Sequence, residues 1–283
     1  MGWLVLTGSG LGPGPGLAPP GSARGLPPGW FLLLRFACFG AISYIISPLQ
    51  KSPLSQKSLV IAIDGPAASG KSTTAKLVAE RLGFLHLDTG AMYRAVTLKV
   101  LREHLDPRDS EMVARLVQST RVELRRESGH LRVLLDGEDV TDEIRSVEVT
   151  QTVSAISSLR AVRQAMVREQ RRIGEQGSVV AEGRDIGTVV FPGADLKFFV
   201  IADIEARARR RQKDLREQGV EKELAEIERA IRERDALDSS REESPLRKAV
   251  DAIELDTSDM TIEDQVQFVV AHVRRLQRRH EAT

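Results

Sequence analysis

The sequence predicts an α/β protein whose mainly parallel sheet is covered by helices on both faces. Short apolar runs, such as 59–63 and 196–201, alternate with stretches of helical periodicity, and this alternation is typical of such a sheet. A glycine-spaced turn follows the first run and leads into a helical stretch beginning near residue 72. That strand–loop–helix order is the context that a phosphate-binding loop requires.

The remaining elements follow from periodicity and turn signals. Apolar spacing predicts helices over 72–82, 92–103, 110–120, 159–173, 205–218, 224–237 and from 261 onward. Apolar runs predict further strands at 84–87, 178–181 and 252–256. Residues 121–145 predict a small antiparallel meander, because strand-like runs flank a turn at 128–129 and an Asp-Gly pair at 136–137.

The turn at residues 65–73 has the composition of a loop that cradles phosphate. Successive backbone N–H groups form an anion nest there, and the N-terminus of the next helix adds partial positive charge. Lys71 supplies a point charge for the β- and γ-phosphates, and the hydroxyl of Ser72 or Thr73 can ligate Mg²⁺. The residues expected to contact the nucleotide are Gly65, Pro66, Ala67, Ala68, Ser69, Gly70, Lys71, Ser72 and Thr73.

Charge and cysteine content exclude several other classes of protein. The chain has 283 residues, with 41 basic and 40 acidic side chains, so its net charge gives no argument for binding nucleic acid. Its single cysteine, Cys38, excludes an intrachain disulfide and a metal cluster built from thiolates. This composition suits a reducing cytosol.

Residues 1–57 differ in composition from the rest of the chain. Residues 1–29 are rich in glycine and proline and almost uncharged, which predicts disorder or a linker. Residues 30–47 are apolar, yet they are short against the ~20 residues of a membrane span and contain Arg35. Three interpretations stay open: a membrane anchor, a removable targeting segment, or a stretch that is not normally translated. We assign no function to it and take 58–283 as the functional domain.

Polar clusters follow two of the predicted strands, where ligands bind in parallel sheets. Asp88-Thr89-Gly90 follows one strand, and Glu182-Gly183-Arg184-Asp185 follows another. Bidentate guanidinium groups suit phosphate, and the arginines nearby are Arg94, Arg163, Arg184, Arg234 and Arg241. A phosphate loop together with an arginine cluster indicates two phosphorylated ligands. Phosphoryl transfer between them is therefore favoured over hydrolysis or a nucleotide switch.

Four stretches together resemble bacterial cytidylate kinase. They read Ile-Asp-Gly-Pro-Ala-Ala-Ser-Gly-Lys-Ser-Thr at 63–73, Leu-Asp-Thr-Gly-Ala-Met-Tyr-Arg at 87–94, Glu-Gly-Arg-Asp-Ile-Gly-Thr-Val-Val-Phe-Pro at 182–192 and Arg-Asp-Ala-Leu-Asp-Ser-Ser-Arg at 234–241. Asp-Ala-Ile-Glu-Leu-Asp-Thr at 251–257 adds to the likeness, which covers about 58 to 280. The phosphate loop alone is unspecific, whereas the second and third stretches are specific.

The resemblance implies a P-loop kinase that transfers the γ-phosphoryl group of ATP to CMP or dCMP with Mg²⁺. It also implies a core, an inserted monophosphate-binding region at about 90–177 that contains the small antiparallel sheet, and a mobile lid at about 205–222. A cytoplasmic monomer that binds these small molecules, but no nucleic acid or membrane, is expected.

The resemblance also suggests roles for individual residues. The catalytic set is Lys71, Arg94, Arg184, Arg234 and Arg241, with the four arginines holding the CMP phosphate. Ser154, Arg163 and Asp185 are expected to read cytosine, Asp238 to contact ribose, and Thr89 to lie in the substrate site. Arg207, Arg210 and Arg211 are the candidates for charges carried by the lid.

Two acidic residues keep alternative interpretations. Glu182 joins Ser72 and Thr73 as a candidate Mg²⁺ group, acting through water, or is a structural acid. Asp88 either takes part in catalysis or caps the helix that follows it. The rival functions are a kinase of another nucleoside monophosphate or small acceptor, and a nucleotide-dependent RNA-binding or switch protein.

Overall fold

The computed structural model describes residues 58–127, 130–217 and 219–281. The expectations for residues 1–57 and for the turn at 128–129 fall outside these ranges. Within the described ranges, no helix is both long enough and apolar enough to cross a membrane.

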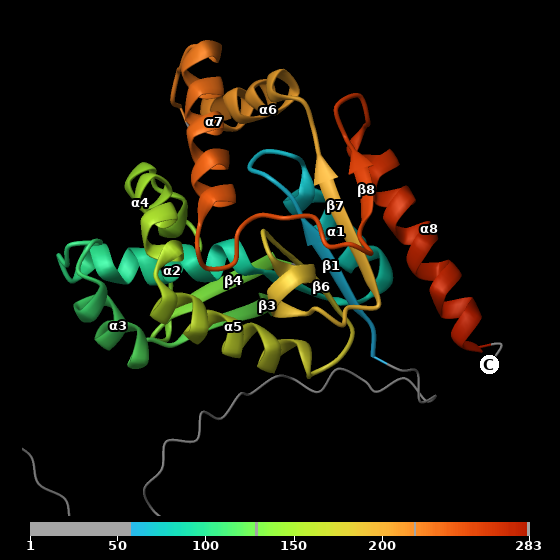
Figure 1. Cartoon of the computed structure of the whole chain (residues 1–283), viewed down its shortest axis with the longest axis horizontal. Coiled ribbons are helices and arrows are strands. Elements are labelled where there is room, and N and C mark those ends of the chain that lie inside the picture. The colour runs from blue at the N-terminus through green and yellow to red at the C-terminus, as the bar shows by residue number, and fades with distance from the viewer. Residues whose placement is uncertain (1–57, 128–129, 218, 282–283) are drawn as a thin grey trace, which may run out of the picture. The chain divides into compact units, whose positions relative to one another are not determined.

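Five parallel strands form the central sheet (Figure 1), in the order β2-β6-β1-β7-β8. They are β1 Val60–Asp64, β2 Leu85–Asp88, β6 Val179–Gly183, β7 Leu196–Ile201 and β8 Ile253–Asp256. The register pairs Asp64 with Gly183 and Asp88 with Glu182. These four positions therefore meet at the carboxyl edge of the sheet, which confirms the predicted α/β class and brings the polar strand ends together.

Helices cover both faces of the sheet because successive side chains along its strands point into two different cores. Ile61 and Ile63 pack with α1 (Lys71–Leu82) and α8 (Ile262–Glu281), whereas Ala62 belongs to the opposite core. That second core contains residues of α2 (Thr89–Arg102) and α5 (Arg160–Gly174). Strands buried on both faces explain the continuous apolar runs in the sequence.

The predicted meander is present as a second, antiparallel sheet. Its order is β3-β4-β5, formed by β3 Val122–Glu127, β4 His130–Leu135 and β5 Glu138–Asp139. It follows α3 (Ser110–Gln118) and precedes a short 3₁₀ turn, Glu143–Arg145, and α4 (Val147–Ser158). The sheet shares the core of α2, so it is an insertion packed on the main domain.

Sequence periodicity did not predict α4. Its first turns are rich in β-branched residues, which have low helix propensity. The helix forms because Val149, Val153 and Ile156 enter the core on one face, while the Ser146 hydroxyl accepts a hydrogen bond from the N–H of Val149. Tertiary burial therefore outweighs local propensity here.

Two charged helices, α6 (Ile204–Glu217) and α7 (Leu224–Ser240), stand beyond the strand tips (Figure 1). They have a small core of their own: Ala208, Leu215, Ile227 and Ile231. The sequence predicted a solvent-facing or mobile 205–218 helix, and most of its side chains are indeed exposed or half-buried. Its buried residues include Arg207, which composition could not reveal.

Candidate active site

The phosphate loop lies between β1 and α1 in a conformation that two glycines allow. Gly70 has φ 88°, in the left-handed region, and leads directly into α1. A Cβ on Gly65 would lie 2.2 Å from the carbonyl oxygen of Val200, so no other residue fits there. Two hydrogen bonds brace the loop from behind: the Thr257 hydroxyl lies 2.9 Å from the carbonyl oxygen of Ser69, and Gln265 accepts a hydrogen bond from Thr74 at 2.7 Å.

Lys71 is a buried cation at the start of α1. Its Nζ lies 3.4 Å from the carbonyl oxygen of Pro66, the single side-chain hydrogen bond it makes among the described residues. Burial, followed by the charge of Arg184, lowers the pKa of Lys71 to about 7, against the opposing influence of Glu182. A bound anion would relieve this penalty.

Ser72, Glu182 and His86 form a chain of polar contacts next to Lys71. The Ser72 hydroxyl donates to Oε2 of Glu182 at 2.5 Å, and Nε2 of His86 lies 3.3 Å from Oε1 of the same carboxylate. Burial disfavours the charge on Glu182, but His86 and Lys71 outweigh it and lower the pKa of this carboxyl. Glu182 is therefore held as a carboxylate behind the loop.

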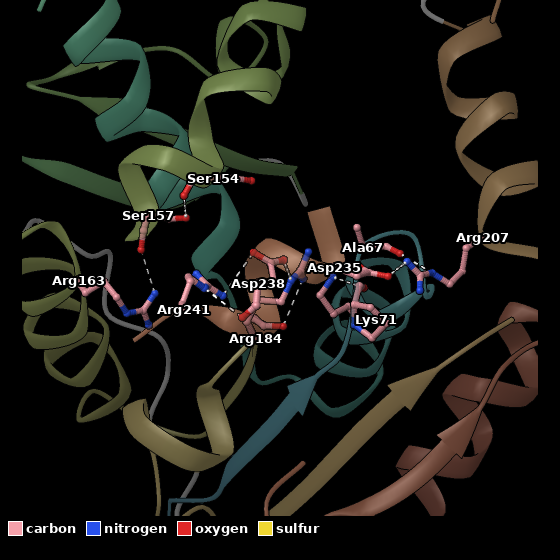
Figure 2. Close-up of polar contacts among 12 residues, drawn as sticks. Ala67, Lys71, Ser154, Ser157, Arg163, Arg184, Arg207, Asp235, Asp238 and Arg241 are labelled. Carbon is pink, nitrogen blue, oxygen red and sulfur yellow. Dashed lines mark hydrogen bonds and ion pairs between the residues drawn. The ribbon is translucent and has the colours of Figure 1, made fainter. Parts of the chain in front are cut away.

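Arg184 is the centre of a group of cations. Burial is the largest cause that lowers the pKa of four neighbouring side chains, and the charge of Arg184 lowers it further. These side chains are Lys71, Arg94, Arg234 and Arg241. Asp238 of α7 partly compensates the group, because it accepts from Nε of Arg184 at 2.7 Å and lies 3.4 Å from Arg241. Figure 2 shows the labelled side chains running from Lys71 past Arg184, Asp238 and Arg241 toward Arg163.

Arg94 and Arg234 are the least compensated members of this cation group. Burial and then Arg184 and Arg94 lower the pKa of Arg234 to about 10, and its buried Nε has no hydrogen-bond partner among the described residues. For Arg94, burial also lowers the pKa, although Asp88 opposes it. Arginines that repel one another in a partly buried site favour the binding of an anionic ligand, because its charge offsets the repulsion.

The predicted cytosine-reading residues Arg163 and Asp185 lie in direct contact, as a buried ion pair. Arg163 also donates to the carbonyl oxygen of Ser157 at 3.3 Å, and its guanidinium carbon lies 5.4 Å from the ring centroid of Tyr93. Ser154 lies one helical turn before Ser157, which donates to its carbonyl oxygen at 3.2 Å (Figure 2). No hydrogen bond among the described residues joins the Ser154 side chain to Arg163.

Two other predicted residues support the strand ends. Thr89 is buried, and its hydroxyl donates to the carbonyl oxygen of Glu182 at 2.6 Å. Asp88 accepts from the N–H of Ala91 at 2.9 Å and so caps α2, which was one of its two sequence interpretations and explains why α2 begins at residue 89 rather than 92. Thr73, by contrast, is exposed on α1.

The three arginines predicted for a lid differ in their surroundings. Arg207 binds the carbonyl oxygen of Ala67 in the phosphate loop at 3.0 Å and pairs with Asp235 of α7. Arg210 donates to the hydroxyl of Thr257 at 3.1 Å and to its carbonyl oxygen at 2.5 Å. The Arg211 side chain makes no hydrogen bond or ion pair with the described residues, yet its charge reaches Arg94 and Arg234. Its charge also acts on Asp214 of the same helix.

Sequence reasoning missed several residues of this region. Tyr93 and Gln170 are buried near Arg163, and burial raises the pKa of the Tyr93 hydroxyl to about 12. Arg145 of the 3₁₀ turn acts electrostatically on Arg94. Asp64 immediately precedes the phosphate loop and accepts two backbone hydrogen bonds from the segment after Asp185. The adjacent loop motif was the available signal for Asp64, whereas Arg145 had none.

A family model for cytidylate kinase matches residues 61–275, which contain the loop, the arginine group and the helices α6 and α7. The chain belongs to the cytidylate kinase family. Among curated relatives, the cytidylate kinase of Lactobacillus gasseri is 44% identical over 218 residues, 77% of this chain and 95% of its own length.

Other members of the family are equally similar. The cytidylate kinase of Caldanaerobacter subterraneus is 48% identical over 215 residues, which cover 76% of this chain and 94% of that protein.

The solved structure of shikimate kinase from Bacteroides thetaiotaomicron is 14% identical, with a TM-score of 0.40, and the match covers 77% of this chain and 99% of that chain. That structural likeness is too distant to bear on the substrate.

Proposed function

We propose that this chain transfers the γ-phosphoryl group of ATP to CMP or dCMP, producing ADP and CDP or dCDP. One observation carries the proposal: Arg184 acts electrostatically both on Lys71 of the phosphate loop and on Arg94, Arg234 and Arg241. Two groups of phosphate ligands therefore adjoin, as transfer between two phosphates requires. The curated relatives named cytidylate kinase support CMP as the acceptor.

Each part of the site has a distinct proposed role. The loop N–H groups and Lys71 hold the phosphates of ATP, and the four arginines hold the phosphate of CMP. Arg163 and Asp185, held by each other, present a donor and an acceptor edge to the base, with Ser154 nearby on α4. Asp238 accepts from the ribose while it orients Arg184.

The chemistry demands alignment rather than proton abstraction. The phosphate monoester of CMP is already anionic and nucleophilic, so no general base is needed. The transition state spreads negative charge over the transferred phosphoryl oxygens, and the surrounding cations stabilise it there. Catalysis follows from holding the acceptor oxygen in line with the γ-phosphorus.

The residues behind the loop fit a magnesium ion. Oxygen ligands suit Mg²⁺, which retains waters and binds through few protein groups and substrate phosphates. The Ser72 hydroxyl would bind it directly, and Glu182 at 2.5 Å from that hydroxyl would orient its water. Within the described ranges no cluster of three His, Cys, Asp or Glu residues could hold a metal. Magnesium held by these residues would supply positive charge against the phosphates of ATP.

The α6–α7 unit is proposed to close over the substrates. Water competes with CMP as the acceptor, so a lid that closes on both nucleotides prevents wasteful hydrolysis. Arg207 and Arg210 fix α6 to the loop side of the site. Arg211 is left to reach the transferring phosphates, because its charge already acts on Arg94 and Arg234.

We also propose that the enzyme acts as a cytoplasmic monomer, as the family resemblance implies. Light scattering of the purified protein tests the first part: a mass near 31.2 kDa is expected for the full chain. Fractionation of cells that express it tests the second.

ADP release measured with each acceptor in turn tests the proposed function. CMP and dCMP should stimulate release strongly, whereas UMP, AMP and a buffer blank should not. A preference for UMP or AMP would replace the proposal with a kinase for that acceptor. Hydrolysis without any acceptor, together with salt-sensitive RNA binding, would favour a nucleotide-dependent RNA-binding or switch protein.

A further inference from the structure

Asp64 is the last residue of β1 and stands directly before Gly65 of the phosphate loop. Its side chain is 4% exposed. Oδ1 accepts a hydrogen bond from the N–H of Ile186 and Oδ2 accepts one from the N–H of Gly187, both at 2.7 Å. The Asp64 carboxylate, next to the phosphate loop, is thus hydrogen-bonded to a segment more than one hundred residues away in the sequence.

Those two N–H groups begin a turn of π-helix, Ile186–Val190, that directly follows Arg184 and Asp185. The first N–H groups of a helical turn lack partners within it, and a carboxylate satisfies them with favourable charge. At the other end of the turn, Arg171 of α5 donates to the carbonyl oxygens of Val190 and Val189 at 2.9 and 2.7 Å. The turn is therefore fixed by Asp64 at its start and by a cation at its end.

The segment has little freedom to shift sideways. A Cβ on Gly187 would lie 3.1 Å from Cδ of Lys197 and 3.4 Å from Oδ2 of Asp64, so backbone and carboxylate are closely packed. On the other side, the Thr89 hydroxyl holds the carbonyl oxygen of Glu182. Arg184 and Asp185 lie between these two points of attachment. Asp64 provides the second of them from strand β1, which leads into the phosphate loop.

The phosphate loop itself relies on other contacts. Thr257 lies 2.9 Å from the carbonyl oxygen of Ser69, and Arg207 binds that of Ala67 at 3.0 Å. Both hydrogen bonds of the Asp64 carboxylate instead hold the segment that follows Arg184 and Asp185, in the proposed CMP site. Loss of the carboxylate should thus disturb the binding of CMP, the phosphoryl acceptor, while sparing the hydrogen bonds that shape the phosphate loop.

We propose that Asp64 is a positioning residue that sets the distance between the two substrates. Its carboxylate fixes the backbone of Arg184 and Asp185 relative to the phosphate loop, so that the CMP phosphate meets the γ-phosphoryl group in line. This inference rests on the proposed CMP kinase activity. Small misplacements matter in such a reaction, since a shift of about 1 Å can cost about a hundredfold in rate.

Asp64→Asn tests this role with little change in volume. The amide keeps one acceptor but places an N–H₂ group against the second backbone donor, so one of the two hydrogen bonds is lost. The KM for CMP should rise about tenfold and kcat should fall, while the KM for ATP should stay within about twofold. The dissociation constant of CMP measured without ATP should rise in parallel.

Asp195→Asn is the matched control. Asp195 accepts from the N–H of Val60 at 2.9 Å, at the opposite end of the same strand β1. That variant makes the same exchange at another carboxylate that holds the backbone, but its amide oxygen can still accept this one hydrogen bond, so the ratio of the two KM values should not change.

Gly187→Ala provides a second route to the same displacement if Asp64→Asn does not fold. Its methyl group presses the segment away from Asp64 and Lys197, and the KM for CMP should again rise selectively. Equal changes in both KM values, or no change in either, for the folded variants would overturn the inference. A wild-type enzyme that does not use CMP would instead overturn the proposed function, so the two failures are distinguishable.

Discussion

Asp238 accepts a hydrogen bond from Nε of Arg184 at 2.7 Å, although the two residues are 54 positions apart and come from α7 and the end of β6. The pair leaves Nη2 of Arg184 without a partner among the described residues, and Nη1 has a weak contact of 3.5 Å to Gly183. Asp238 therefore holds the guanidinium group by one edge, and the other edge is the one that we propose binds the CMP phosphate.

Arg184→Ala should impair acceptor use more than donor use. The change removes a charge-assisted contact to the CMP phosphate, so the KM for CMP should rise about tenfold or more and kcat should fall. Steady-state kinetics with each substrate varied in turn measures the two effects. If only the affinity for ATP changed, Arg184 would not belong to the acceptor site.

Asp238→Ala should weaken binding of both CMP and dCMP. It removes the group that orients Arg184 and also the proposed contact to the sugar, and it leaves Arg184 and Arg241 less compensated. Calorimetric titration with both nucleotides measures the loss, expected to be about tenfold for CMP. Unchanged affinity for both nucleotides would contradict the role proposed for Asp238.

The sequence predicted the strands, the meander and the strand-end clusters because each has a strong local signal. Apolar runs marked the buried strands, and an Asp-Gly turn marked the meander. By contrast, α4 was missed because β-branched residues obscure its helical pattern, and its formation depends on burial of Val149 and Ile156. Local patterns carry no information about such long-range packing.

Within the site, the sequence predicts candidate residues but not the partners that hold them. Arg163 and Asp185 were placed in one subsite, and the structure joins them as an ion pair. The surroundings of the three lid arginines could not be distinguished, because hydrogen bonds from Arg207 to the loop and from Arg210 to Thr257 depend on the tertiary fold. Asp64 shows the same limit, since its partners are 122 and 123 residues away.

Lys71 should give the free enzyme a pH-dependent affinity for ATP. Burial and Arg184 lower its pKa to about 7, so its charge is lost in the free enzyme as the pH rises through 7. kcat/KM for ATP should therefore decline above about pH 7, by up to about tenfold per pH unit. kcat should stay level to higher pH, because bound phosphates favour the charged lysine.

The same shift has a consequence for stability. Between about pH 7 and the ordinary lysine pKa of 10.5, unfolded chains bind a proton at Lys71 that folded chains lack, so the free energy of unfolding rises with pH through this window. Lys71→Ala should abolish turnover, leave the fold intact and remove the pH dependence of the free energy of unfolding in this window. Near-normal activity of this variant would refute the phosphate-loop assignment.

Glu182→Gln should raise the magnesium requirement. The amide keeps the size of the side chain but removes the negative charge that lies 2.5 Å from the Ser72 hydroxyl. The magnesium concentration giving half-maximal activity should rise about tenfold or more, with a smaller effect on the KM for CMP. A structural acid predicts a different result: a lower melting temperature at an unchanged magnesium optimum.

Arg211→Ala should lower kcat while leaving the lid folded. Arg211 has no side-chain partner in the described part of the chain, but its charge reaches Arg94 and Arg234. Removing it deletes a cation near the transferring phosphate, so kcat should fall about a hundredfold. Arg209→Ala is the control, since Arg209 is exposed on the same helix and pairs with Glu205 at 2.5 Å. Equal effects of the two substitutions on kcat would show that α6 contributes general positive charge rather than one positioned arginine.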